Sequence, residues 1–88
     1  MRSQSISAFL LTIFAALAMN RKFSDRLILL RQEKDLTQVQ VANGTGLTEN
    51  SIQNYERGRR KPTYDALIAI AKYFNVSLDY LCGLSDEP

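Results

Sequence analysis

The strongest constraint on the fold of this chain is a helix-start signal that recurs along it. Ser24, Thr37, Thr48, Thr63 and Ser77 each precede a stretch whose apolar residues have helical spacing. A serine or threonine oxygen in that place accepts a hydrogen bond from a free amide of the first helical turn. No stretch alternates apolar and polar residues as a half-buried strand would. The sequence therefore predicts an all-α domain of five short helices.

Glycines and apolar spacing set the expected bounds of these helices. Gly46 suits a tight turn after the second helix, and Gly58 and Gly83 end the third and the fifth. Gly44 lies inside the second helix, where it costs about 0.5 to 1 kcal/mol, so we expect that helix to be soft. The expected helices are Ser24 to Lys34, Thr37 to Thr45, Glu49 to Arg57, Tyr64 to Phe74 and Leu78 to Cys82.

The inward faces follow from the same periodicity. Phe23, Leu27 and Leu30 form one stripe on the first helix. The fourth helix has a broader apolar face and is predicted to be core scaffolding; its apolar residues are Leu67, Ile68, Ile70, Ala71 and Phe74.

Length and composition exclude most catalytic chemistry. The chain has 88 residues, enough for one compact core. It has no histidine and a single cysteine, Cys82, so the usual general base, a nucleophilic pair, a zinc cluster and an internal disulfide are all missing. We therefore expect a protein that is not an enzyme, with no cofactor and no metal, in a reducing compartment such as the cytoplasm. Cys82 is interpreted as a packing residue.

The first 18 residues differ from the rest of the sequence. Met1 and Arg2 lead into an uncharged apolar stretch, Ile6 to Ala18, which is too short to span a membrane as a helix. Three interpretations stay open: an extra helix, a start-site artefact because Met19 opens a sequence that is complete without it, or a signal-like peptide ending in 16–18. We divide the chain into an extension at 1–18, a domain at 19–84 and a short tail at 85–88.

Positive charge is concentrated at one place. The formal net charge is only +2. Four of the cations stand within five residues, and these are Arg57, Arg59, Arg60 and Lys61. Such a run is usually a solvated surface, so its position in the fold decides what it does.

Ala42, Gly46 and Ile52 lie between capped helices at the spacing of a helix-turn-helix. Two helices that cross closely need a small contact residue, a permissive turn and a branched anchor. With further motifs, these residues resemble the Cro/repressor-type family, also called the xenobiotic-response-element family, over residues 23–84. The motifs are Leu36-Thr37-Gln38, Ala42, Gly46-Leu47-Thr48, Ser51-Ile52, Tyr55-Glu56-Arg57-Gly58, Lys61-Pro62 and Val76-Ser77-Leu78-Asp79-Tyr80-Leu81.

The third helix has a polar face opposite its apolar anchors. Ile52 and Tyr55 lie on one side and are expected to anchor the helix in the core. The polar residues share an arc of roughly 140° on the other side. They are Glu49, Asn50, Gln53, Asn54 and Arg57. An isolated helix with this pattern would present an ordinary solvated face, but inside a helix-turn-helix beside a basic loop it favours contact with the DNA major groove.

The family resemblance implies a role for each polar residue. It implies base contacts from Glu49, Asn50 and Asn54, and backbone or flanking-base contacts from Ser51 and Gln53. It implies that Gln38 contacts a phosphate and braces the recognition helix, and that Arg31 pairs with Glu56 to tie the first helix to the third. The basic cluster, Arg57, Arg59, Arg60 and Lys61, is interpreted as a phosphate clamp that positions the protein without reading sequence.

The sequence thus predicts a sequence-specific regulator of transcription, a repressor, that binds double-stranded DNA as a homodimer and does not bind a membrane. A dimer would place two recognition helices on half-sites about 34 Å apart. The candidate dimer contacts are Val76, Leu78, Leu81 and Leu84, to which the extension could add. An alternative is that these leucines only close the core. Another is a protein-interaction module or antitoxin in which DNA binding is secondary.

Deletion of residues 1–18 tests the domain boundary. The truncated chain is expected to fold and to recognise the same operator, because the predicted helices and their core all begin after Met19. Dimer affinity falls if the extension contributes to the contact. Circular dichroism and duplex titrations measure both properties. An unfolded truncated chain would mean that the extension belongs to the core.

Overall fold

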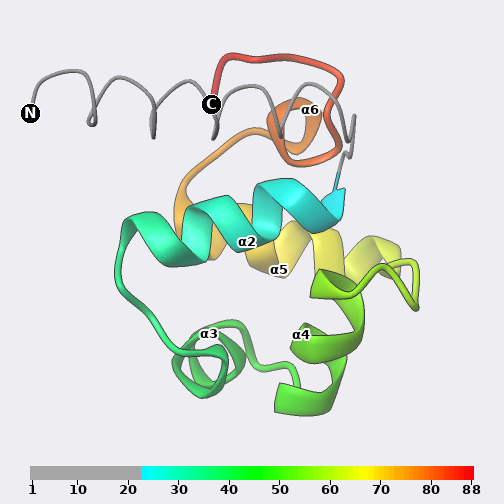
Figure 1. Ribbon diagram of the computed structural model, residues 1–88. Helices are drawn as coiled ribbons and strands as arrows, with labels where there is room; N and C mark the ends of the chain where they lie inside the picture. The colour runs from blue at the N-terminus through cyan, green and yellow to red at the C-terminus, as the bar shows by residue number, and fades with distance from the viewer. Residues whose placement is uncertain (1–22) are drawn as a thin grey trace, which may run out of the picture.

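The computed structural model describes residues 23–88, and over this range the chain is helical with no strand. The prediction of an all-α domain with five short helices is confirmed for these residues, and the expectations for 1–18 lie outside them. Figure 1 shows the helices in order: α2 (Phe23–Glu33), α3 (Gln38–Thr45), α4 (Glu49–Glu56), α5 (Tyr64–Phe74) and α6 (Leu78–Leu81).

Side-chain caps start four of these helices as predicted. The hydroxyl oxygens of Thr37, Thr48, Thr63 and Ser77 each accept a hydrogen bond from the backbone N–H three residues later. The prediction of a cap at Ser24 is wrong, because α2 already begins at Phe23. The ring of Phe23 packs edge-on against Tyr55 at a centroid distance of 5.5 Å. This tertiary contact holds residue 23 in the first turn, a position that local cap signals do not reveal.

Helix ends fall one residue earlier than predicted at three places. α2 ends at Glu33, and Asp35 follows it with a φ of 54°. α4 ends at Glu56 and α6 at Leu81, so Arg57 and Cys82 are their C-cap residues. In each case a left-handed residue follows within two positions, and the chain turns away before another helical residue is added.

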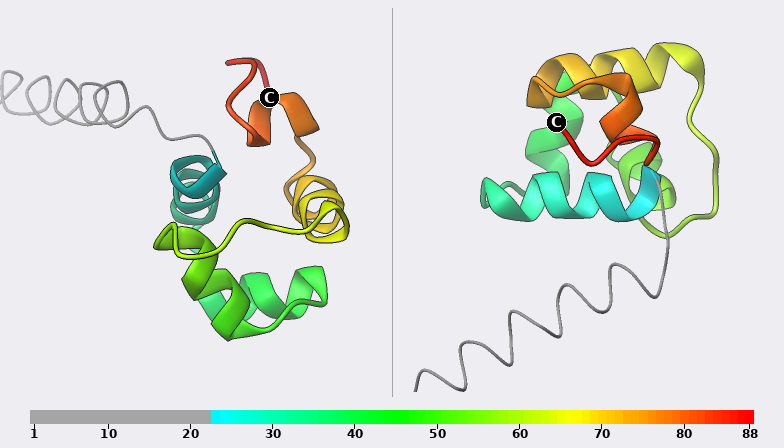
Figure 2. Two further views of the ribbon diagram at one scale, coloured as in Figure 1. Left: turned by 90° about the vertical axis from the view of Figure 1, so that its right-hand side faces the viewer. Right: turned by 90° about the horizontal axis from the view of Figure 1, so that it is seen from above.

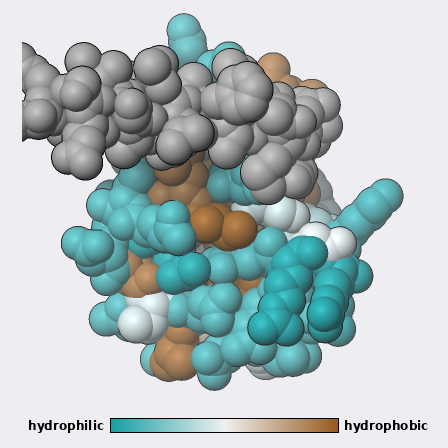
Figure 3. All heavy atoms as spheres, viewed as in Figure 1, coloured by the Kyte–Doolittle hydropathy of each residue, from teal (hydrophilic) through white to brown (hydrophobic). Residues whose placement is uncertain are grey.

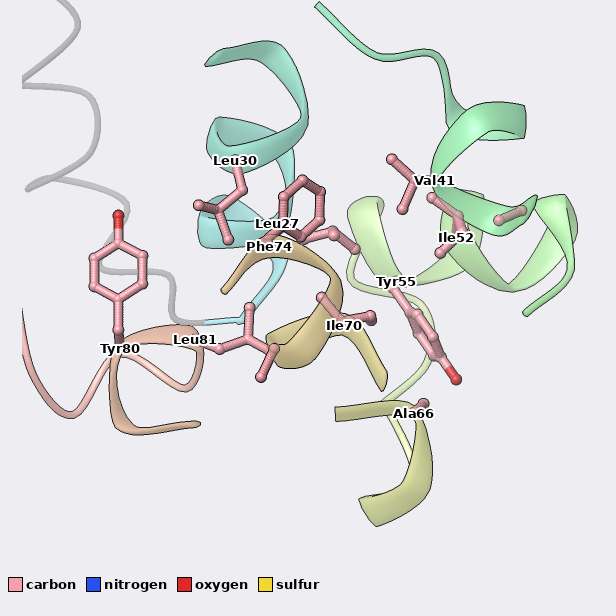
Figure 4. Packing of buried hydrophobic residues seen from close by; sticks show 12 residues of the cluster. Leu27, Leu30, Val41, Ile52, Tyr55, Ala66, Ile70, Phe74, Tyr80 and Leu81 are labelled. Carbon is pink, nitrogen blue, oxygen red and sulfur yellow. The ribbon is translucent and has the colours of Figure 1, made fainter. Parts of the chain in front are cut away.

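The core draws one or two large side chains from each helix. Leu27, Val41, Ile52, Ile70 and Leu81 have no measurable solvent exposure. Figure 4 shows them converging with the neighbouring buried residues. Because Leu81 is fully enclosed by its own chain, the expectation that it contributes to a dimer contact is wrong, and it closes the core instead. The stripe predicted on α2 is confirmed, since Leu27 and Leu30 are buried and Phe23 packs against them.

α3 and α4 lie at the end of the molecule opposite α6 (Figures 1 and 2). The turn between them begins at Gly46, whose φ of 79° is left-handed, and its N–H donates to the carbonyl of Ala42. Ala42 is 3% exposed and Ile52 is fully buried, as the helix-turn-helix spacing requires. The position of Gly46 in the left-handed region explains why a glycine stands there.

The C-terminal tail is held against α2 by Arg26. Its guanidinium lies 4.2 Å from the ring centroid of Tyr80, donates to the carbonyl of Ser85 and pairs with the Asp86 carboxylate at 2.8 Å. The view from above in Figure 2 shows the tail passing beside the start of α2. The C-cap Cys82, expected to be a packing residue, is half-buried nearby.

Gly44 has a packing role that could not be inferred from its low helix propensity. A Cβ atom at this position would lie 2.1 Å from a ring carbon of Tyr73 on α5. The Tyr73 ring is itself fixed, because it packs against the core and meets Phe74 edge-on at 5.0 Å. Glycine in α3 therefore lets α5 approach closely.

Gly44→Ala tests this packing. In the natural background it is expected to lower the free energy of unfolding by about 1 kcal/mol, because overpacking against Tyr73 exceeds the gain in helix propensity. In a Tyr73→Ala background the same change should stabilise the fold by up to about 1 kcal/mol. Urea unfolding of the four proteins gives both values. Equal effects in the two backgrounds would show that the ring moves aside without loss.

Candidate nucleic-acid interface

The orientation of α4 is set by two anchors on its inner face. Ile52 is fully buried and Tyr55 is 3% exposed. Figure 4 shows both side chains directed into the packed interior. A helix of eight residues with two such anchors has little freedom to rotate about its axis, so the opposite face is held toward solvent.

The polar arc predicted for this outer face lies at the surface. Glu49, Asn50 and Arg57 are exposed, and Gln53 and Asn54 are half-buried. Two members are already engaged: the Gln53 amide donates to the Glu49 carboxylate at 3.4 Å. Asn50 is exposed on the arc, and within residues 23–88 no hydrogen bond is made by its side chain.

Ser51, predicted to contact the DNA backbone, is part of the helix cap. The Thr48 hydroxyl donates to the Ser51 hydroxyl at 3.0 Å, while the Ser51 N–H donates back to the Thr48 oxygen at 3.0 Å. Its hydroxyl hydrogen is still available to an outside acceptor. The cap therefore orients Ser51 without using all of its bonding capacity.

An ion pair connects α2 to the end of α4. Arg31 donates from Nε to one carboxylate oxygen of Glu56 at 2.6 Å and from Nη2 to the other at 3.0 Å. The pair that the family resemblance implied is thus present. The side chains are 18% and 6% exposed, so the bond is largely shielded from water. The hydrogen bond to Glu56 raises the pKa of Arg31 above its ordinary value, and the guanidinium stays charged wherever the domain is folded.

Two further bonds extend this pair to α3. Gln38 donates from Nε2 at 2.9 Å to the Glu56 oxygen that also accepts from Arg31 Nη2. This bond makes Gln38 a brace between α3 and α4. Arg31 also donates from Nη1 to the Leu36 carbonyl at 3.0 Å and so fixes the loop that enters α3. No side-chain pattern in the sequence marks a carbonyl acceptor, and this bond was not anticipated. The phosphate contact expected of Gln38 stays a prediction.

The basic cluster directly follows α4. The N–H groups of Gly58 and Arg59 donate to the carbonyls of Tyr55 and Asn54, which folds the loop back on the end of α4. Arg57, Arg59, Arg60 and Lys61 are exposed, and across residues 23–88 none of them forms an ion pair. Figure 3 shows a largely hydrophilic surface around this end of the molecule, with isolated apolar side chains.

Other kinds of site are not found in the part of the chain that the structure describes. Residues 23–88 contain no cluster of three or more potential metal ligands. No helix in this range has the length and apolar character needed to cross a membrane.

Comparisons with known proteins match this chain to a helix-turn-helix family and to regulators of transcription. A helix-turn-helix family model matches residues 27–81. The uncharacterized HTH-type transcriptional regulator YobD of Bacillus subtilis is 38% identical over 75% of this chain and 59% of its own length. The cryptic phage CTXphi transcriptional repressor RstR of Vibrio cholerae is 36% identical over 73% of this chain and 58% of its own. The chain thus spans somewhat more than half the length of these relatives.

A solved structure has the same fold. The P22 c2 repressor, crystallised with a synthetic operator, superposes with a TM-score of 0.69 over 74% of this chain and 98% of its own, at 23% identity. At that identity the likeness is one of fold.

Removing either partner of the Arg31–Glu56 ion pair is predicted to destabilise the fold, and the two losses should differ in size. Arg31→Ala is expected to lower the free energy of unfolding by about 3 kcal/mol, because it leaves the Glu56 carboxylate shielded with only Gln38 as a partner. Glu56→Ala should cost less, because the more exposed guanidinium can reach water. Thermal and urea unfolding of the single and double variants measure the coupling.

Asp86→Ala supplies the control for this cycle, because it removes the exposed partner of another arginine ion pair. It should change stability little, since surface pairs contribute little. If the stability losses of Arg31→Ala and Glu56→Ala were additive and as small as that of Asp86→Ala, the proposed coupling between Arg31 and Glu56 would be contradicted.

Proposed function

This chain belongs to the helix-turn-helix family of Cro/repressor-type regulators, and on that basis we propose that it is a transcriptional regulator that binds double-stranded DNA sequence-specifically. The observation that carries the proposal is the burial of Ile52 and Tyr55, which turns the polar arc of α4 outward. An eight-residue helix is about 12 Å long and fits a major groove about 12 Å wide. The relatives reported above are named as regulators, in keeping with a function that is not enzymatic.

Sequence discrimination is assigned to Asn50, Asn54 and Glu49. An asparagine amide can form two hydrogen bonds with adenine, and a glutamate accepts one from the cytosine amino group. Asn50 and Glu49 are exposed on the outward arc, and Asn54 is half-buried. The Gln53 amide donates to the Glu49 carboxylate at 3.4 Å, so the two side chains lie together on the outward arc.

The residues around these three base-contacting side chains are assigned to hold the protein in position on the duplex. Gln38 stands in the first turn of α3, where the free amides of a helix start favour a phosphate. Arg57, Arg59, Arg60 and Lys61 are unpaired within residues 23–88 and supply the charge that neutralises the backbone. Ser51 and Gln53 flank the base contacts.

Two copies are proposed to act together. Leu78 is 38% and Leu84 is 79% exposed on or beside α6, at the end of the molecule away from α3 and α4. Val76 is half-buried against the core and adds a smaller contact. A homodimer through this patch leaves both recognition helices free for half-sites about one helical turn apart. Repression in the cytoplasm is the activity proposed, supported by the relative named as a repressor.

Selection of duplexes from a random pool at a defined salt concentration tests the proposal. Enrichment of a two-fold symmetric sequence is expected. If no duplex is enriched and the protein instead captures a protein partner, DNA binding is secondary and the interaction-module alternative holds.

Asn50→Ala and Asn54→Ala are expected to change sequence preference. Each should weaken binding to the selected operator by about 1 to 3 kcal/mol and affect a duplex altered at the contacted base pair much less. Titrations against the operator and its single-base variants measure the difference. Equal losses on every duplex would mean that the recognition face has been misassigned.

Arg59→Ala and Lys61→Ala are the matched controls from the basic cluster. They should weaken all duplexes alike and make affinity less dependent on salt, because each removes a phosphate contact and the counterion release that accompanies it. A change in sequence preference in these variants would contradict the division between base and backbone contacts.

A further inference from the structure

Val39 is an exposed apolar side chain beside the proposed interface that none of the roles above uses. It is 44% exposed in the first turn of α3. Its neighbours along the chain, Gln38 and Gln40, are polar, and both are held by hydrogen bonds of their own. A single exposed valine is ordinary on a protein surface, so its place relative to α4 decides whether it has a role.

The periodicity of α3 places Val39 on the side of α4. At about 100° per residue, Val39 lies roughly 140° around the helix from Gly44, which faces Tyr73 of α5. Gln38, bonded to Glu56 of α4, lies about 100° from Val39 and about 120° from Gly44. Val39 is therefore on the flank of α3 that borders the outer face of α4 and is directed away from α5.

A surface groove confirms this placement. Val39 lines it together with Gln38, Leu36 and Glu49. Gln38 is assigned to the DNA backbone and Glu49 to a base edge. An apolar group thus lines the same groove as a residue proposed to contact the backbone and one proposed to contact a base.

Val39 is also held rigidly before any ligand binds. The capping box fixes the first turn of α3: the Gln40 N–H donates to the Thr37 oxygen at 3.0 Å, and the Thr37 N–H donates to the Gln40 amide oxygen at 2.8 Å. A valine in a helix has one strongly preferred side-chain rotamer. Its two methyl groups therefore have a defined direction and lose little freedom on binding.

The apolar group that base pairs display in the major groove is the C5-methyl of thymine. We propose that Val39 is a specificity-determining residue that packs on a thymine methyl in the operator. The inference rests on the proposed function. It adds a preference by apolar contact to the hydrogen-bonding preferences of α4.

Uracil substitution tests the contact one methyl group at a time. In the duplex obtained by selection, each thymine is replaced in turn by uracil, which removes the methyl and keeps the pairing. The natural protein should lose about fourfold in affinity at one thymine of each half-site, the value expected for one buried methyl group. Val39→Ala should bind the operator more weakly and show no further loss at that thymine.

Leu29→Ala is the matched control, because it truncates another exposed apolar side chain, 37% exposed, on α2. It should respond to uracil as the natural protein does. Alanine is the best helix former and Val39 is exposed, so Val39→Ala should keep its fold, which circular dichroism checks.

The outcomes separate the two proposals. Identical uracil profiles for the natural protein and Val39→Ala, in a chain that selects a defined operator, would overturn the role of Val39 and leave the proposed function intact. Failure to select any operator would overturn the proposed function and this inference with it.

Discussion

The arrangement of α2, α3 and α4 depends on the hydrogen bonds that the Glu56 carboxylate accepts. This carboxylate accepts hydrogen bonds from Arg31 and Gln38, and Arg31 in turn holds the Leu36 carbonyl. A shielded charge with all its partners is tolerable, whereas one that loses a partner is strongly destabilising. The angle between α3 and α4 is therefore maintained by the penalty for breaking the network as well as by the apolar contacts of Ile52 and Ala42.

Much of the fold could be predicted because its signals are local. A threonine cap, a capping box and a left-handed glycine each act within a few residues, and α3 and α5 were placed correctly from them. Apart from the helix ends, which fell one residue early at left-handed turns, the errors arose where a distant part of the chain decides. Phe23 belongs to α2 because Tyr55 packs on it, and Gly44 serves Tyr73 although it weakens its own helix. Sequence spacing contains neither contact.

In the candidate site, too, some features follow from local sequence and others depend on distant parts of the chain. The outward arc of α4 follows from periodicity, since burial of Ile52 leaves Asn50 on the other side. The pairing of Arg31 with Glu56 came from family resemblance, because no local rule links residues 25 positions apart. The burial of Leu81 and the groove that Val39 lines with Glu49 depend on the packing of whole helices. They became visible only when those helices were positioned.

The two faces of α4 have a consequence for how such proteins diversify. The buried anchors Ile52 and Tyr55, together with Glu56 at the end of the helix, supply most of what α4 contributes to folding, while Asn50 on the outer face contributes little. Mutations at the outer position are thus close to neutral for stability. Selection for a folded chain and selection for a particular target act on separate sets of side chains. A lineage can acquire new genomic targets by exchanging a few exposed residues, without first passing through poorly folded intermediates.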